Sequence, residues 1–255
     1  MGLRRQTGRK KVETSWDEVA DWYVGWVGTQ GSKHHRRLAI PSVMELLEVR
    51  PKEQILDLGA GPGVLAGPIA EQGAVYTGID ASERLIRFAR RHHGDKGRFV
   101  VGDVRQLERL PFLRAGSFDG AVFMLSLQDI DPIEAALRSA AWALRTGGRL
   151  VLLLTHPCFR IPRQSGWGWD EGRKLHYRRV DRYLTPVAVP LRDGATRSFH
   201  RPLHMYINGL AECGLLLDCM REITSYKQFH ERAEQRAEQE FPVFLALRAR
   251  KIASG

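Results

Sequence analysis

Residues 55–63 constrain the fold most, because an apolar strand runs into an acid and then into glycines at alternate positions, Ile-Leu-Asp-Leu-Gly-Ala-Gly-Pro-Gly. Gly59, Gly61 and Gly63 allow the backbone to turn tightly and to approach a ligand closely. A helix that begins near Pro62 would direct its free N–H groups and the positive end of its dipole at the same place. This order predicts a strand-to-helix turn against which a nucleotide-like ligand can lie.

Acidic residues close two further apolar runs where neighbouring strands of such a sheet would end. Asp80 closes the run 74–80, and a carboxylate at that strand tip can accept both hydrogen bonds of a ribose diol. Asp103 follows the run 99–102 and could hold an exocyclic amine such as adenine N6. The run 118–127 predicts a fourth strand. Since ligands of open α/β sheets bind outside the carboxyl ends of the strands, these groups are expected to lie together.

The glycine spacing separates two classes of nucleotide-binding fold. A dinucleotide site has Gly-x-Gly-x-x-Gly, whereas this chain has Gly-x-Gly-x-Gly, with Val64 in the last position of the dinucleotide pattern. Residues 55–64, Asp80, the segment 102–104 and the runs 118–127 and 144–152 together resemble the class I S-adenosylmethionine-dependent methyltransferases. The resemblance is to their small-molecule branch, which includes the quinone-biosynthesis methyltransferases, and it is strongest over residues 40–155.

The resemblance implies an α/β fold with a Rossmann-like, doubly wound, mostly parallel sheet of seven strands, whose last strand is antiparallel. It implies S-adenosylmethionine as the cofactor, held by Tyr23, Asp57, Gly59, Ala60, Gly61, Gly63, Asp80, Ala81, Asp103, Val104 and Met124. Asp57 would face the amino-acid end of the donor, or alternatively would cap the helix that follows. Tyr23 would close over the same end, or would only pack in the core.

The chain divides into a tail, a cap and a core. Residues 1–14 are expected to be a disordered basic tail, residues 15–50 to form cap helices and residues 51–255 to form the methyltransferase domain. Thr14 or Ser15 with Glu18 resembles a capping box at the start of the first helix. The predicted strands are 54–58, 74–79, 98–101, 118–124, 149–155, 215–224 and 241–251, and the predicted helices are 40–48, 63–72, 82–92, 104–109, 131–145 and 203–213. Gly147 and Gly148 would end the helix 131–145, and residues 231–240 would form a solvated connector.

Residues 156–202 form an insertion that is long for a connection between a strand and a helix, since such connections are usually ~2–6 residues. It combines aromatic side chains with arginines, and its segment 175–189 alternates well enough to form strands. We expect a lid over the carboxyl edge of the sheet, in which Trp167, Trp169, Tyr183 and His200 line the substrate pocket. The alternative is that these aromatic side chains pack a small satellite core.

His156 is the predicted catalytic residue because it directly follows the fifth strand and would project beside the methyl-donor site. An imidazole there could accept a proton from the acceptor. The alternative is a turn at His156-Pro157 in which the ring only satisfies a loop group. His200 and His204 are rival bases. Asp129 and Asp131 could touch substrate, although an N-cap role for Asp131 ahead of a proline is favoured.

Charge and cysteine content restrict the remaining classes. The net charge of +10 is concentrated in the tail and in the insertion. A solvated basic surface explains it, and an anionic small substrate or RNA are the alternatives. Cys158, Cys213 and Cys219 show no metal-ligand spacing and cannot all pair, which favours a reduced, cytoplasmic setting and no metal. The longest apolar run, 150–154, is far too short to cross a bilayer, and the N-terminus lacks the apolar region of a secretory signal.

The predicted function is methyl transfer from S-adenosylmethionine to a nitrogen or oxygen nucleophile of a small molecule. An RNA methyltransferase that uses the tail and the insertion is the alternative, and a non-catalytic donor-binding protein is the third interpretation. The Asn/Asp-Pro-Pro-Tyr/Phe segment of amino-methylating nucleic-acid enzymes is absent, and Ser126-Leu-Gln-Asp stands at the equivalent position. The sequence leaves the acceptor and the oligomeric state open.

Overall fold

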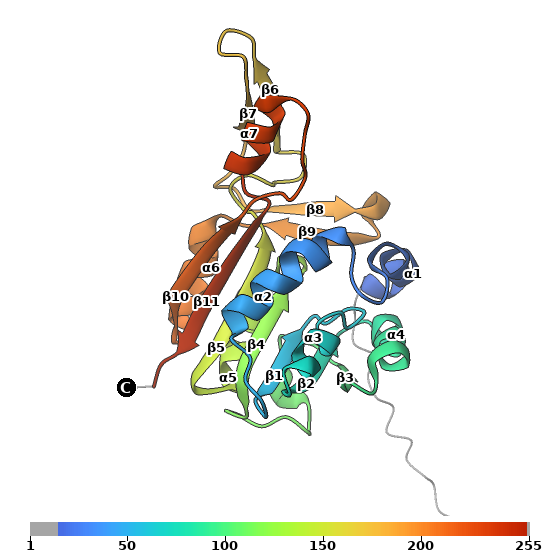
Figure 1. Cartoon of the computed structure of the whole chain (residues 1–255). Coiled ribbons are helices and arrows are strands. Elements are labelled where there is room, and N and C mark those ends of the chain that lie inside the picture. Colours follow the sequence, from blue (N-terminus) through green and yellow to red (C-terminus); the bar gives the residue numbers. More distant parts are fainter. Residues whose placement is uncertain (1–14, 254–255) are drawn as a thin grey trace, which may run out of the picture.

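A computed structural model describes residues 15–253, so the predicted basic tail lies outside the described residues. A seven-stranded sheet forms its centre, with the strand order β10-β11-β5-β4-β1-β2-β3 (Figure 1). Its strands are β1 (Gln54–Leu58), β2 (Val75–Asp80), β3 (Gly97–Val101), β4 (Phe118–Met124), β5 (Leu144–Thr155), β10 (Leu215–Ile223) and β11 (Phe244–Lys251). All run parallel except β11, which pairs antiparallel with both neighbours. The predicted fold class is confirmed.

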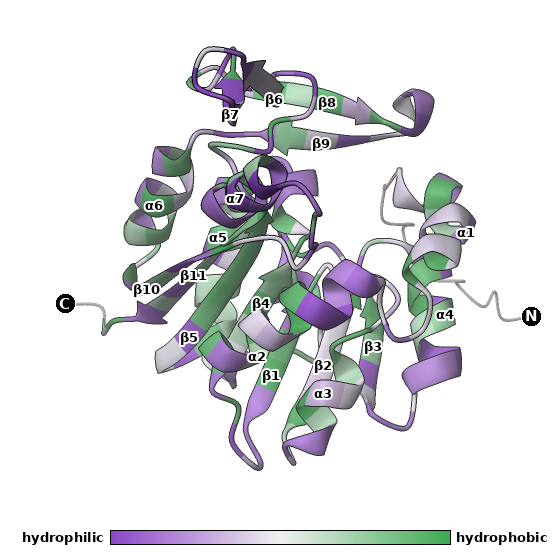
Figure 2. Cartoon of the chain, turned by 45° about the horizontal axis from the view of Figure 1, so that its top comes forward, coloured by the Kyte–Doolittle hydropathy of each residue, from purple (hydrophilic) through white to green (hydrophobic). Residues whose placement is uncertain are grey.

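Helices cover both faces of the sheet. They are α1 (Trp16–Val27), α2 (Ile40–Leu47), α3 (Ala66–Glu71), α4 (Glu83–His93), α5 (Ile133–Ala143), α6 (Leu203–Glu212) and α7 (Arg232–Glu240). Ile55 packs with α2, α3 and α4 on one face, whereas Leu56 and Leu58 pack in the cluster of α5 and α6 on the other. The split follows the two-residue alternation of a strand, and Asp57, between the two leucines, lies on the face of Ile55, where Tyr76 hydrogen-bonds it. Figure 2 shows the hydrophobic residues concentrated on central strands such as β5.

The turn after β1 differs from the prediction, because α3 begins at Ala66 rather than near Pro62. Gly61 and Gly63 have φ of +52° and +82°, which a right-handed helix cannot accommodate. The predicted helix 104–109 is only a 3₁₀ turn, η2 (Leu107–Arg109). The glycines thus extend the loop at the sheet edge before the helix starts.

The junction of α5 and β5 is also shifted, since α5 ends at Ala143 and β5 begins at the next residue. Gly147 and Gly148 therefore do not end the helix. They lie in a bulge of β5, between the pairs Phe118–Leu144 and Gly120–Arg149, and Gly147 has φ of +76°. The N-cap of α5 is Pro132, so the predicted capping role of Asp131 is wrong.

The N-terminal cap consists of α1 and α2. A π-helical turn, η1 (His35–Ala39), directly precedes α2. Ser15 does not form the predicted capping box, because its hydroxyl hydrogen-bonds Thr196 Oγ1 at 2.8 Å instead of capping α1, and Thr14 lies outside the described residues. Asp17 Oδ1 accepts hydrogen bonds from the Ser82 hydroxyl at 2.6 Å and from the Arg84 N–H at 3.2 Å. These bonds hold α1 beside the loop after β2.

The insertion contains two hairpins that lie in different places (Figure 1). The hairpin of β6 (Ser165–Asp170) and β7 (Leu175–Val180) projects from the body and packs on α7. The hairpin of β8 (Val187–Leu191) and β9 (Thr196–His200), with the turn η4 (Arg192–Gly194), crosses the carboxyl edge of the sheet. The predicted connector 231–240 is largely the helix α7, whose polar composition suits its exposed position. Within residues 15–253, no helix is both long and apolar enough to cross a membrane.

Candidate functional site

The loop after β1 is fixed against the ends of β2 and β4. The N–H groups of Gly59 and Ala60 both donate to the Ile79 carbonyl, at 2.8 and 3.0 Å. Gly59 has φ of +73°, and a Cβ there would lie 2.5 Å from Ser126 Cβ. Ser126, which follows β4 and a single linking residue, donates its hydroxyl to the Leu58 carbonyl at 2.6 Å. Only glycine fits at position 59, so the loop can press against its neighbours.

Asp80 ties this loop to the end of β2. Its Oδ2 accepts the Gly61 N–H and its Oδ1 accepts the Ser82 N–H, each at 2.8 Å. Burial raises the pKa of the carboxyl, and the two backbone hydrogen bonds only partly oppose that rise. Each carboxylate oxygen has a further lone pair that can accept a hydrogen bond from a hydroxyl group.

Asp57 lies beneath the loop rather than in the cavity above it. The Tyr76 hydroxyl donates to Asp57 Oδ2 at 2.7 Å, and burial raises the pKa of this carboxyl to about 7. The alternative role of Asp57 as a helix cap is wrong, since Leu65 is the N-cap of α3 and no side chain caps it. Asp57 supports the loop from below.

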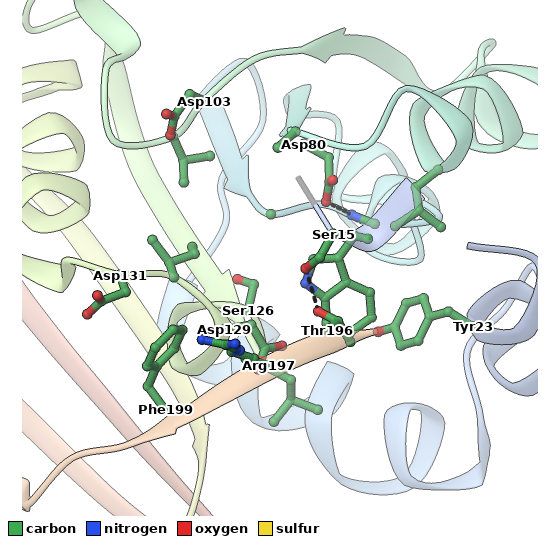
Figure 3. A pocket seen from close by; sticks show the side chains of 18 of the residues that line it. Ser15, Tyr23, Asp80, Asp103, Ser126, Asp129, Asp131, Thr196, Arg197 and Phe199 are labelled. Carbon is green, nitrogen blue, oxygen red and sulfur yellow. Dashed lines mark hydrogen bonds between the residues drawn. The ribbon is translucent and has the colours of Figure 1, made fainter. Parts of the chain in front are cut away.

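A cavity of about 510 Å³ lies above the carboxyl ends of β1, β2 and β4 (Figure 3). The predicted donor residues that line it are Tyr23, Gly59, Gly61, Asp80, Ala81, Asp103, Val104 and Met124. Asp57, Ala60 and Gly63 are not in its wall. Asp103 is engaged by the Arg105 guanidinium, with Nη2 to Oδ2 at 2.9 Å. The turn η4 and strand β9 cover the cavity through residues 194–197 and Phe199.

A second cavity of about 410 Å³ adjoins the first, and the two share Trp16, Tyr23, Leu125, Asp129 and Phe199. Its remaining wall is rich in aromatic and basic side chains, among them Trp22, Trp26, His34, His35, Arg160, His200, Arg201, Tyr206 and Phe244. Burial lowers the pKa of His35 to about 4, so this ring is neutral at pH 7. The second cavity therefore combines aromatic side chains with two guanidinium groups, and its one carboxyl lies on the side of the first cavity.

The structure does not place His156 in either cavity wall. The ring is 1% exposed, and its Nδ1 accepts the Cys158 N–H at 3.2 Å. The proton is therefore on Nε2, which faces Glu222 Oε1 at 2.9 Å. Burial lowers the pKa of His156 despite this carboxylate. Both nitrogens are committed within the fold, which fits the turn interpretation and removes the geometric basis for a catalytic base.

Three of the four predicted substrate residues also lie outside the cavity walls. Trp167 and Trp169 are on β6 and are 39% and 43% exposed, and the Trp167 ring packs edge-on against Phe241 with centroids 5.4 Å apart. Tyr183 accepts the Leu203 N–H at 2.9 Å. These contacts match the satellite-core alternative. His200 alone of the four lines the second cavity, where its Nε2 lies 2.7 Å from the Tyr183 carbonyl oxygen.

The aromatic wall comes instead largely from α1 and β9, where only Tyr23 and His200 were predicted site residues. Trp16, Trp22, Tyr23 and Trp26 follow helical spacing, and this was the available signal. Asp129 ends a 3₁₀ turn, η3 (Leu127–Asp129), and its place in both cavity walls agrees with the expectation that it could touch substrate. Residues 15–253 contain no cluster of three or more His, Cys, Asp or Glu side chains that could hold a metal ion.

Comparison with known proteins identifies the family. A family model for a methyltransferase domain matches residues 56–152. A solved S-adenosylmethionine-dependent methyltransferase from Mesorhizobium loti aligns with a TM-score of 0.69 and 27% identity, over 82% of this chain and 96% of that one. These matches support a class I S-adenosylmethionine-dependent methyltransferase. S-adenosylmethionine is the methyl donor of this family, and the loop and edge carboxylates described above have the chemistry to bind it.

Curated relatives of this chain include enzymes of quinone biosynthesis. A demethylmenaquinone methyltransferase of Tropheryma whipplei is 36% identical over 129 residues, which are 49% of each chain. A ubiquinone biosynthesis O-methyltransferase of Xanthomonas axonopodis pv. citri is 36% identical over 99 residues, which are 39% of this chain and 41% of that protein. The chain thus spans about half the length, or less, of these relatives.

The burial of Asp57 makes a prediction for stability. Its pKa is about 7 in the folded protein against 3.8 for a free carboxyl, so the folded state binds more protons than the unfolded state between these pH values. The stability that this carboxyl contributes is complete below about pH 4 and is lost as the pH rises to about 7. The Asp57→Asn variant keeps an acceptor for Tyr76. As the pH rises through this range, it should become more stable relative to the normal protein by up to about 1.4 kcal/mol per pH unit.

Urea unfolding of both proteins at pH 5, 6, 7 and 8 measures this difference, from which other titrating groups cancel. The difference should grow up to pH 7 and then stay constant. Parallel stability curves over the whole range would show that the buried carboxyl does not titrate as the structure requires.

Proposed function

We propose that this protein transfers the methyl group of S-adenosylmethionine to an oxygen or nitrogen of a small molecule held in the aromatic cavity. The observation that carries the proposal is the shared wall of the two cavities, which allows a donor in the first and an acceptor in the second to meet. The donor supplies a sulfonium methyl with a good leaving group. The protein's task is then to align the acceptor, exclude water and take up a proton.

In this proposal each donor-binding residue contacts a different part of S-adenosylmethionine. Asp80 accepts hydrogen bonds from the ribose hydroxyls, Asp103 lies toward the adenine, and the glycine loop contacts the middle of the donor. Tyr23 closes the site at the boundary between the cavities, where burial and nearby carboxylates keep its pKa raised and its hydroxyl protonated. Of the insertion, only the β8–β9 hairpin acts as a lid, together with the cap helix α1.

A small acceptor is favoured over RNA. Relatives that share about a third of their aligned residues with this chain are named for demethylmenaquinone and for ubiquinone biosynthesis. The second cavity is covered by α1 and β9 and has a volume suited to a small molecule. Labelled donor incubated with the protein and a cell extract should place the label in the small-molecule fraction. Label in RNA, with activity that falls steeply with salt, would favour the alternative.

Donor binding itself is a direct test. Calorimetry should detect S-adenosylmethionine and its demethylated product, S-adenosylhomocysteine, but not NAD. Asp80→Ala should weaken donor binding by about 1–3 kcal/mol, because hydrogen bonds to a charged group are lost. Asp95→Ala, a change at an exposed carboxylate that pairs with Lys96, is the matched control and should bind normally. Binding of NAD in place of the methyl donor would contradict the proposal.

A further inference from the structure

Asp129 has an unusual position among the described residues. Its Oδ1 and Arg201 Nη1 are the two buried side-chain polar atoms within residues 15–253 that have no hydrogen-bond partner. Both residues line the aromatic cavity, and Asp129 also lines the donor cavity (Figure 3). Buried polar atoms nearly always have a hydrogen-bond partner. An acceptor and a donor without partners in one cavity therefore indicate that a ligand supplies the missing hydrogen bonds.

The surroundings of Asp129 keep its carboxyl near the point of ionisation. Burial raises its pKa, which the Ser198 hydroxyl and the Arg201 guanidinium lower again, to a net value of about 7. The titratable groups that face it are Tyr23 of α1 and Tyr206 of α6. Both phenols have raised pKa values and stay neutral, so Arg201 is the charged group that acts on Asp129. A carboxyl of this kind can accept a proton at neutral pH and release it afterwards.

Arg201 is fixed in place by the loop after β4. Its Nη2 donates to the Ile130 carbonyl at 2.7 Å and to Asp131 Oδ1 at 2.8 Å, and its side chain is 4% exposed. The guanidinium also lies over the Phe199 ring, 5.0 Å from the centroid. These contacts leave Nη1 as a rigidly held donor for an oxygen atom of a ligand.

The cavity walls restrict the shape and charge of that ligand. Trp22 and Trp26 stack with ring planes 5° apart and centroids 6.4 Å apart, and Trp16, Phe199 and Phe244 add further rings. Flat aromatic molecules pack well against such walls. Arg160 and Arg201 both line the cavity, and two guanidinium groups against one carboxylate disfavour an ammonium group. A hydroxyl is therefore the favoured nucleophile.

We infer that Asp129 is the catalytic base for a flat aromatic acceptor whose reacting hydroxyl lies beside a carbonyl or carboxylate oxygen held by Arg201. This inference rests on the proposed methyl transfer. The acceptor O–H bond breaks and its proton goes to Asp129, while the oxygen forms a bond to the methyl carbon. The sulfur–methyl bond breaks, and its electron pair stays on the sulfur. The products are an aryl methyl ether and the neutral thioether.

The test measures recognition of the hydroxyl in the protein saturated with S-adenosylhomocysteine. The probes are 3-hydroxy-2-naphthoate and naphthalene-2-carboxylate, which differ only in the hydroxyl group, and binding is followed by calorimetry at pH 7.5. The normal protein should bind the hydroxy compound about tenfold or more tightly than the other. Asp129→Asn should lose most of this preference, and Arg201→Lys should weaken both probes. Asp181→Asn, at an exposed carboxylate of the projecting hairpin, should behave normally.

Retention of the hydroxyl preference by Asp129→Asn, or failure of both probes to bind the normal protein, would overturn the inference. The Asp129→Asn protein should also be thermally more stable than the normal protein at pH 8 but not at pH 5. This result would show that the variant folds and that the carboxyl is buried. Failure of S-adenosylhomocysteine to bind would contradict the proposed function instead. The probe preference measured without it would still judge the role of Asp129 in recognition.

Discussion

Gly59→Ala should reduce the affinity for S-adenosylhomocysteine by about a hundredfold or more. At φ of +73° an alanine costs about 1–2 kcal/mol, because its Cβ crowds the following carbonyl. The same Cβ would lie 2.5 Å from Ser126 Cβ and 2.9 Å from its hydroxyl oxygen. Ser126 cannot move freely, since it is bonded to the Leu58 carbonyl and leads into the turn that ends at Asp129. Relief of the clash would therefore displace the floor of the donor cavity, and calorimetry measures the loss.

Gly67→Ala is the matched control for this change. Gly67 lies in α3, in ordinary helical conformation, and a Cβ there would meet no atom within 4 Å. Alanine in a helix is more stable than glycine by about 0.5–1 kcal/mol, so this variant should be slightly more stable and should bind the donor normally. If Gly59→Ala bound within threefold of the normal protein, the close contact of the loop with Ser126 would not shape the donor site.

The donor side could be predicted because its determinants are local. The acid and glycines follow β1 directly, and Asp80 and Asp103 each follow an apolar run. In a parallel sheet the carboxyl ends lie at one edge, so the order of residues along the chain already gives their arrangement in space. Even here the sequence misplaced the start of α3, because Gly61 and Gly63 both adopt positive φ and delay the helix.

The acceptor side could not be predicted because its determinants are distant in sequence. His156 follows β5, as expected, but β11 is inserted beside β5, and Glu222 of β10 reaches the imidazole ring from the far side. The β6–β7 hairpin, with Trp167, Trp169 and Tyr177, is the more aromatic of the two hairpins in the insertion, yet it lines neither cavity. Packing against α7 and Phe241 draws Trp167 away from the sheet edge. No local sequence pattern indicates which of the two hairpins covers the sheet edge.

Asp129 illustrates the same limit. Its neighbours Tyr23, Ser198 and Arg201 come from α1 and from the region of β9, about 70 to 100 residues away along the chain. A sequence pattern can place the carboxyl after β4. Its burial and its missing hydrogen-bond partner depend on how those segments close over it.

The second large effect concerns the opposite edge of the sheet, where Arg149→Met should lower the free energy of unfolding by about 3–5 kcal/mol. The Arg149 side chain is 6% exposed, and its Nη2 lies 2.5 Å from Glu53 Oε2. Its Nε donates to the Leu47 carbonyl, and Nη2 also donates to the Glu48 carbonyl at 3.3 Å. Methionine fills much of the space but leaves a largely buried carboxylate and the end of α2 without donors.

Urea unfolding of Arg149→Met measures this loss, and Arg87→Met is its matched control. The Arg87–Glu83 pair is on the surface, with side chains 72% and 57% exposed, so its removal should change stability by less than about 0.5 kcal/mol. Because Arg149 joins α2 to β5 and to the segment before β1, and lines neither cavity, Arg149→Met should still bind S-adenosylhomocysteine with near-normal affinity at a temperature where it is folded. Equal stability losses in the two variants would mean that the buried guanidinium does not hold the cap helix to the sheet. A loss of donor affinity in the folded variant would mean that the cap helix, through this anchor, controls the shape of the donor site.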